Sequence, residues 1–310
     1  MKIAFVFPGQ GSQSVGMFDA WSDNAVAMDS IASASAALDQ DLLGLMAQGP
    51  EDALGLTTNT QPVMLAAAVA MYNAWIDAGG QVPSVVAGHS LGEYSALTAA
   101  GALDLQDAVR LVRIRADAMQ DAVPVGTGTM AAILGLDDDV VLRACADAAG
   151  EQTVEAVNFN APSQVVIAGH TEAVERACAL AKDAGARRAV VLPVSAPFHS
   201  SLLQPASVVL EAALASVTMR TPDVTLINNV DVARPEQPEA IKDALVRQAW
   251  HAVRWVEIIQ AMKRDGVTHV VECGPGKVLS GLTRRIDRDL VSLSINDPAS
   301  MQAALETLKG

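Results

Sequence analysis

Residues 85–94 read Val-Val-Ala-Gly-His-Ser-Leu-Gly-Glu-Tyr, and this stretch decides the fold. An apolar run typical of a buried strand comes first, the pattern Gly-x-Ser-x-Gly follows, and a segment with helical character continues to Ala100. The two glycines allow a tight turn from strand to helix, which places the Ser90 hydroxyl at a helix N-terminus. We interpret the stretch as a nucleophile elbow. The alternative, a glycine-rich turn without chemistry, is disfavoured by the flanking strand and helix.

Short apolar runs alternate with longer amphipathic segments on both sides of this elbow. That alternation is typical of a parallel sheet covered by helices, and it predicts an α/β fold whose large domain is hydrolase-like. Each run is too short and too apolar to be a surface helix. The strands expected for the large sheet span residues 3–7, 84–87, 224–228, 268–271 and 290–293.

The rhythm changes between residues 127 and 195, where strand, helix, strand, strand, helix and strand follow one another. A β-α-β-β-α-β order closes a small ferredoxin-like sheet by itself, so we expect an inserted subdomain there. The predicted organisation is a large catalytic domain, 1–126 and 196–310, with a small ferredoxin-like subdomain at 127–195. Its expected elements span residues 130–134, 138–149, 154–158, 164–168, 171–184 and 188–194.

The composition excludes several classes of protein. In 310 residues, 51% are hydrophobic and 18% are charged, which excludes intrinsic disorder, and a net charge of −14 disfavours nucleic acid as a partner. Apolar stretches are interrupted before they reach the length of a membrane span, and the first apolar run, 3–7, is shorter than a secretory core. Three cysteines without metal-like spacing fit a reducing compartment, so we expect a cytoplasmic protein with no membrane contact.

A serine hydroxyl needs a base to act as a nucleophile, and His199 is the histidine best placed to provide one. It follows Pro197, which stiffens a loop at the point where the chain returns to the large domain. No spacing rule identifies an acid for a third triad member, so a dyad whose imidazole is held by a backbone carbonyl stays open. The histidines compared are His89, His170, His199, His251 and His269.

A third candidate, Arg115, comes from helical geometry. Residues 104–123 predict a helix whose polar side chains gather on one face, whereas Arg115 projects to the opposite side, near Met119. A guanidinium on a core-facing stripe needs an anion, because it stays charged and burial without a partner is costly. That anion is either a buried Asp or Glu, or a substrate carboxylate held close to Ser90.

Two glycine-containing loops do not fit nucleotide binding. The loop Gly9-Gln10-Gly11 lacks the third glycine of a dinucleotide fingerprint, since position 14 is serine. Its better use is to turn a backbone amide towards the active site as an oxyanion donor. The loop at 274–277 has Val278 where a phosphate loop needs Ser or Thr. Because no ligand set has zinc spacing either, we expect no metal and no cofactor.

Taken together, these motifs resemble the malonyl-CoA:acyl carrier protein transacylases, the acyltransferase family of fatty acid and polyketide synthesis. The resemblance runs end to end and implies an α/β hydrolase-like domain with a ferredoxin-like insert. It implies malonyl transfer from malonyl-CoA to the phosphopantetheine thiol of an acyl carrier protein, through a malonyl-serine ester. The segments that carry it are 7–13 (FPGQGSQ), 88–93 (GHSLGE), 158–160 (NFN), 197–200 (PFHS) and 274–279 (GPGKVL).

The resemblance also implies a role for each site residue. Ser90 would be the acylated nucleophile and His199 its base. The chain departs from the family at Ala252, beside the segment that would orient the base, where a proline is usual. The other roles are Arg115 as the anchor of the malonyl carboxylate, the amides of Gln10 and Leu91 as the oxyanion hole, the carbonyl of Gln248 as the group that orients His199, and Met119 and Phe198 as pocket residues.

Two alternatives remain open: an acyltransferase of a polyketide pathway with another acyl choice, and a serine thioesterase or esterase. We expect a monomer. Carrier proteins are acidic, so a chain of net charge −14 needs a local basic surface to bind one. The residues proposed for that surface are Lys182, Arg187, Arg188, Lys277, Arg284 and Arg285.

Overall fold

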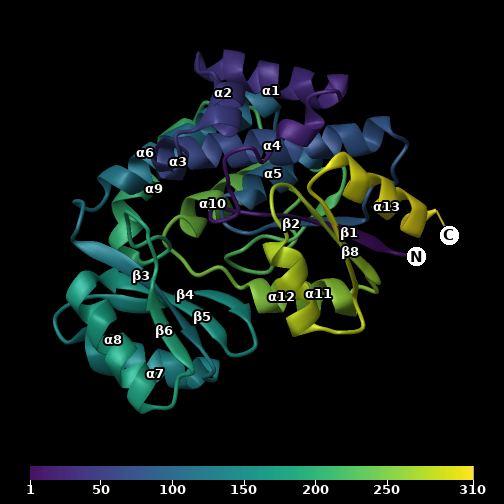
Figure 1. Ribbon diagram of the computed structural model, residues 1–310. Helices are drawn as coiled ribbons and strands as arrows, with labels where there is room; N and C mark the ends of the chain where they lie inside the picture. Colours follow the sequence, from purple (N-terminus) through teal and green to yellow (C-terminus); the bar gives the residue numbers. More distant parts are fainter. Residues whose placement is uncertain (310) are drawn as a thin grey trace.

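The structure is a computed structural model that describes residues 1–309 (Figure 1). Its larger sheet consists of five strands: β1 (Ile3–Phe7), β2 (Val85–Gly88), β7 (Thr225–Leu226), β8 (His269–Cys273) and β9 (Val291–Ile295). All are parallel, in the spatial order β7-β2-β1-β8-β9. Each strand begins within one residue of its predicted position, and the parallel α/β sheet is confirmed.

The central strand β1 is buried on both faces, as parallel strands covered by helices are. On one face, the Phe5 ring lies 5.7 Å from that of Tyr72 and 5.4 Å from that of Trp75, both on α4 (Thr57–Asp77). On the other face, Val6 packs in a separate apolar cluster with α11 (Trp255–Arg264). Figure 1 shows these two helices on opposite sides of the sheet.

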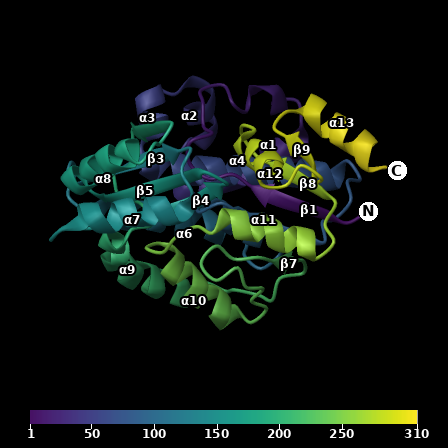
Figure 2. The same ribbon diagram turned by 90° about the horizontal axis from the view of Figure 1, so that it is seen from below.

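The remaining helices complete the large domain around this sheet, and the view from below shows α9 and α10 closing one side (Figure 2). None of the helices within residues 1–309 is both long enough and apolar enough to cross a membrane. The remaining helices of the large domain are α1 (Ala25–Leu38), α2 (Leu42–Gln48), α3 (Glu51–Gly55), α5 (Gly92–Ala99), α6 (Leu105–Asp121), α9 (Gln204–Ala215), α10 (Pro238–Gln248), α12 (Val278–Ile286) and α13 (Pro298–Leu308), with short 3-10 helices η1 (Asp19–Trp21) and η2 (Ser201–Leu203).

A second, antiparallel sheet with its own apolar core lies to one side in Figure 1. Its elements are β3 (Gly128–Leu134), α7 (Asp138–Ala149), β4 (Val154–Ala161), β5 (Gln164–His170), α8 (Thr171–Asp183) and β6 (Arg188–Val191). The strand order β4-β5-β3-β6 is that of a ferredoxin-like sheet. The last strand is shorter than predicted, because residues 192–194 leave the sheet to line a cavity. We retain 127–195 as the proposed extent of this subdomain.

The register of β1 and β2 positions the site. Phe7 pairs with Gly88, so the loops that follow the two strands leave the sheet side by side at its carboxyl edge. Ligands of open α/β sheets bind at that edge. The first loop carries Gln10, and the second carries Ser90.

Candidate active site

The turn after β2 has the backbone geometry of a nucleophile elbow. Ser90 has a φ of 55°, in the left-handed region that costs a non-glycine residue energy. A Cβ at Gly88 would overlap the backbone of Gly92, and a Cβ at Gly92 would overlap the Phe7 carbonyl. Close backbone contacts therefore require glycine at both positions of the Gly-x-Ser-x-Gly pattern. The Ser90 side chain projects from the turn between them.

The His199 side chain lies between Ser90 and a backbone carbonyl. Its Nε2 is 2.6 Å from Ser90 Oγ, and its Nδ1 is 2.9 Å from the oxygen of Gln248. Because a carbonyl only accepts, Nδ1 carries the proton and Nε2 is free to accept from the serine hydroxyl. Burial, and then the positive charge of Arg115, lower the pKa of His199 to about 3. The imidazole is therefore neutral, as a general base must be.

Arg115 is 1% exposed, as the helical geometry predicted, but its partners are not carboxylates. Its guanidinium donates to Gln61 Oε1 at 2.7 Å, to Gln248 Oε1 at 3.0 Å and to Ser90 Oγ at 3.1 Å. A guanidinium has five N–H donors, so two are left without a partner among residues 1–309. The buried ion pair with Asp or Glu considered above is therefore wrong, since every protein partner of Arg115 in this part of the chain is neutral.

Two backbone amides in the segments that follow β1 and β2 make no hydrogen bond among the described residues. The amides of Gln10 and Leu91 have no hydrogen-bond partner within residues 1–309. The neighbouring amide of Ser90 is occupied, because it donates to Asn229 Oδ1 at 2.7 Å. The free amides belong to the segments that follow the adjacent strands β1 and β2, and both residues line one cavity, where two N–H donors can hold an oxyanion.

A cavity of about 530 Å³ joins these groups. Gln248 is not part of its lining and lies behind it, fully buried, at the end of α10. The predicted residues that line the cavity are Gln10, Ser90, Leu91, Arg115, Met119, Phe198 and His199.

Three polar residues that were not predicted from the sequence hold the site together: Gln61, Glu93 and Asn229. Gln61 lies in α4 and binds Arg115, while Asn229 follows β7 and also donates from Nδ2 to the Gly88 carbonyl at 2.7 Å. Glu93, in the first turn of α5, accepts from the amide of Asn229 at 3.0 Å. A glutamine inside the apolar α4 segment was the one available signal, because a buried polar side chain needs a partner.

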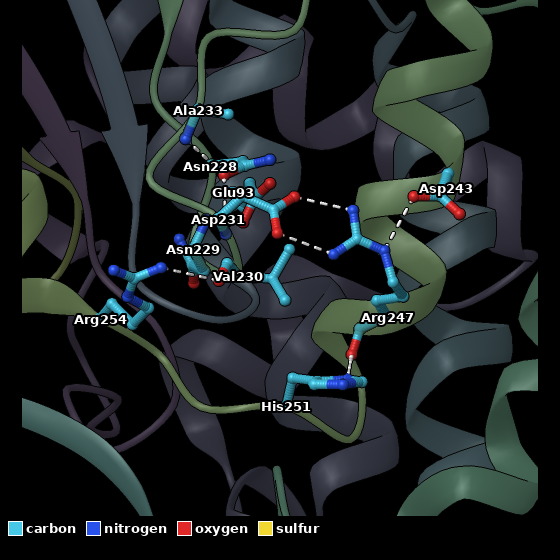
Figure 3. A network of polar contacts seen from close by, with 10 residues as sticks. All are labelled: Glu93, Asn228, Asn229, Val230, Asp231, Ala233, Asp243, Arg247, His251 and Arg254. Atoms are coloured by element: carbon cyan, nitrogen blue, oxygen red, sulfur yellow. Dashed lines mark hydrogen bonds and ion pairs between the residues drawn. The ribbon is translucent and has the colours of Figure 1, made fainter.

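A further polar network surrounds Arg247, which precedes Gln248 in the sequence (Figure 3). Arg247 makes a bidentate ion pair with Asp231, with N···O distances of 2.9 and 2.7 Å. This pair joins the end of α10 to the loop after β7. The carbonyl of Arg247 lies 2.8 Å from Nδ1 of His251. This contact closes the turn that precedes Ala252, so the segment is held by side-chain hydrogen bonds where relatives are expected to use proline.

Comparisons with known proteins agree with this geometry. A family described as acyl transferase domain matches residues 4–291. The malonyl CoA-acyl carrier protein transacylase of Escherichia coli (strain K12) is 53% identical over 306 residues, which cover 98% of this chain and 99% of the relative.

Solved structures are equally similar. The acyl-carrier-protein S-malonyltransferase of Burkholderia pseudomallei 1710b superposes with a TM-score of 0.98 at 63% identity, covering 99% of this chain and 100% of that one. A malonyl-transacylase solved in complex with its type II polyketide synthase acyl-carrier protein gives 0.98 at 48% identity, with coverage of 99% and 100%. The chain therefore belongs to the acyl transferase family, in the branch of the malonyl-CoA:acyl carrier protein transacylases.

Proposed function

We propose that this protein transfers the malonyl group of malonyl-CoA to the phosphopantetheine thiol of an acyl carrier protein, for fatty acid chain elongation. Relatives named for this reaction cover the chain end to end. The observation that carries the proposal is the distance of 3.1 Å between Arg115 and Ser90 Oγ. It places a fixed positive charge with two unused donors beside the nucleophile, as an acyl group that ends in a carboxylate requires.

In the first half-reaction, Ser90 Oγ attacks the thioester carbonyl while its proton passes to Nε2 of His199. The carbonyl oxygen becomes an oxyanion that accepts hydrogen bonds from the amides of Gln10 and Leu91. When the tetrahedral species collapses, the C–S bond breaks and the CoA sulfur takes the proton from His199. The product is a malonyl ester of Ser90.

In the second half-reaction, the thiol of the carrier protein gives its proton to His199, and its sulfur attacks the ester carbonyl. The same two amides hold the new oxyanion, and the proton returns to Ser90 Oγ as the C–O bond breaks. Gln248 keeps the imidazole in one tautomer throughout, because its carbonyl only accepts. Arg115 holds the malonyl group away from water while the ester waits for the carrier.

The acyl pocket and the acceptor complete the proposal. Met119 and Phe198 line the cavity as apolar walls beside Arg115, so they limit the size of the group between thioester and carboxylate. We expect no metal and no resident cofactor, because CoA and phosphopantetheine arrive with the substrates and the reaction needs only a nucleophile, a base and an oxyanion hole.

We propose that the carrier docks on a basic hollow of about 590 Å³ beside the small sheet. Arg187, Arg188 and Arg285 line it, and Arg285 also reaches across from α12 to the side chain of Gln164. These are three of the six basic residues selected from the sequence. Three guanidinium groups around one concavity suit the acidic surface of a carrier protein.

The test is the intact mass of the protein after it is mixed with malonyl-CoA, acetyl-CoA or methylmalonyl-CoA, for the wild type and Ser90→Ala. A single malonyl adduct that is absent in Ser90→Ala and disappears when holo carrier protein is added is the expected result. Free malonate without an adduct would instead identify a thioesterase or esterase. An equal methylmalonyl adduct would favour a polyketide acyltransferase with another acyl choice.

A further inference from the structure

Glu93 is a buried acid that the reaction described above does not use. It lies in the first turn of α5, three residues after the nucleophile, and is 1% exposed. Its Oε2 accepts from the backbone amide of Asn229 and from Nε2 of Gln248, both at 3.0 Å. Figure 3 shows it facing the loop at 228–233 that the Asp231 ion pair ties to α10. Burying a carboxylate costs free energy, so a buried carboxylate that takes no part in the reaction needs a structural explanation.

The contacts of Gln248 show what Glu93 does. Its amide nitrogen has two protons, and both are used: one on the Ser90 carbonyl at 2.8 Å and one on Glu93. Its amide oxygen is then left to accept from Arg115 at 3.0 Å. If the amide were rotated by half a turn, its oxygen would face a carboxylate and a carbonyl, and its NH₂ would face a guanidinium. Each of these pairings is repulsive, so Glu93, together with the Ser90 carbonyl, selects the orientation that serves Arg115.

The same arrangement decides how the charge of Arg115 is balanced. A carboxylate in direct contact with the guanidinium would occupy the donors that a malonyl carboxylate needs. Here a neutral amide lies between Glu93 and Arg115, so the negative charge is near enough to favour a buried cation and leaves its donors free. Arg115 from α6 in turn favours the ionised form of Glu93, whereas Asp231 from the loop opposes it. The third neighbour, Tyr94, is a neutral phenol whose pKa burial raises to about 12.

We propose that Glu93 is a positioning residue for malonyl recognition: it locks the side chain of Gln248 with its oxygen towards Arg115, which orients the guanidinium without neutralising it. This inference rests on the proposed malonyl transfer. It makes the hydrogen-bonded series Glu93–Gln248–Arg115 a determinant of acyl choice, and it separates two roles of Gln248. The main chain of Gln248 orients the base, while its side chain, set by Glu93, orients the anchor.

The test compares the acylation half-reaction with malonyl-CoA and with acetyl-CoA in Glu93→Gln, which keeps shape and one acceptor oxygen but removes the charge. We expect kcat/KM for malonyl-CoA to fall about tenfold through a higher KM, the equivalent of one weakened hydrogen bond to a charged group. Acetyl-CoA has no carboxylate, so its kcat/KM is expected to change less than about twofold, within the error of additivity. Equal losses for the two donors would overturn the inference, because they indicate a merely structural role.

Two further measurements exclude a general loss of structure. Burial raises the pKa of Glu93 to about 7, so malonylation by the wild type is expected to lose efficiency below about pH 7. That pH dependence should be absent with acetyl-CoA and in Glu93→Gln. In a double-mutant cycle, Glu93→Gln should add nothing to Arg115→Met. Persistence of the pH dependence in Glu93→Gln, or full additivity, would each overturn the inference.

Glu272→Gln is the matched control. Glu272 is also a fully buried glutamate that accepts two hydrogen bonds, from the amides of Leu279 at 3.0 Å and Ser280 at 2.7 Å, and it lies outside the cavity. Its substitution should lower stability and leave the ratio of malonyl to acetyl efficiency unchanged; a change as large as that of Glu93→Gln would overturn the inference. A wild type that shows no preference for malonyl-CoA would refute the proposed function itself. The wild type is therefore measured before any variant is made.

Discussion

Replacing Arg115 by methionine tests the proposed interaction between this guanidinium and the malonyl carboxylate. Methionine is long and unbranched, so it fills most of the space of the arginine stem inside α6 without a large cavity. The change removes the only guanidinium that lines the site cavity within residues 1–309. The groups proposed to attack and activate the thioester are left in place, namely Ser90, His199 and the free amides.

The size of the effect follows from the contacts. Two N–H donors of Arg115 are without a protein partner in the described chain, and a malonyl carboxylate can accept up to two hydrogen bonds from the guanidinium. A hydrogen bond between charged groups contributes about 1.5–3 kcal/mol, so two contribute about 3–6 kcal/mol. At about 1.4 kcal/mol per factor of ten, kcat/KM for malonyl-CoA should fall by about 10²–10⁴. For acetyl-CoA, kcat/KM should fall only because the contact between Arg115 and Ser90 Oγ is lost, which amounts to about tenfold or less.

The assay is rapid mixing followed by intact-mass detection of the acylated protein, with both donors at several concentrations. Circular dichroism and thermal unfolding confirm that the variant is folded, because Gln61 Oε1 and Gln248 Oε1 lose a donor. Arg113→Met is the control, since Arg113 lies on the same helix but binds Gln40 away from the cavity. Equal losses with malonyl-CoA and acetyl-CoA would refute the assignment of Arg115 to the substrate carboxylate.

Three other predictions address the turn, the base and the docking surface. Gly92→Ala should lower the free energy of unfolding by about 3 kcal/mol, measured in urea, because the new methyl group overlaps the Phe7 carbonyl. The folded-state pKa of His199 lies below its unfolded value of 6.5, at about 3, so its contribution to stability is lost as pH falls through this window. Between pH 7 and 4.5 the wild type should therefore lose about 3 kcal/mol more than His199→Asn. Arg188→Glu should raise KM for the carrier protein several-fold and leave acylation by malonyl-CoA unchanged; an unchanged KM would contradict docking at this hollow.

Local sequence was sufficient for the class of fold and for the elbow. A buried parallel strand, a Gly-x-Ser-x-Gly turn and an amphipathic helix each have a signature within about ten residues, because side-chain periodicity and glycine geometry act over that distance. The same reasoning placed Arg115 on the buried face of α6 and predicted the order of elements in the small sheet. The base could be selected as His199 only because there are few histidines and one lies in a stiff loop.

The tertiary structure decided which groups these residues meet. Gln61, Glu93, Asn229 and Gln248 come from four segments far apart along the chain, and no spacing rule connects them. The choice between an ion pair and an open anion site at Arg115 depended on these contacts. Hydrogen bonds between distant segments are set by the packing of helices against the sheet, and packing has no local signature in the sequence. The sequence by itself therefore predicted the candidate reacting groups, whereas the fold determined which charges and hydrogen bonds surround them.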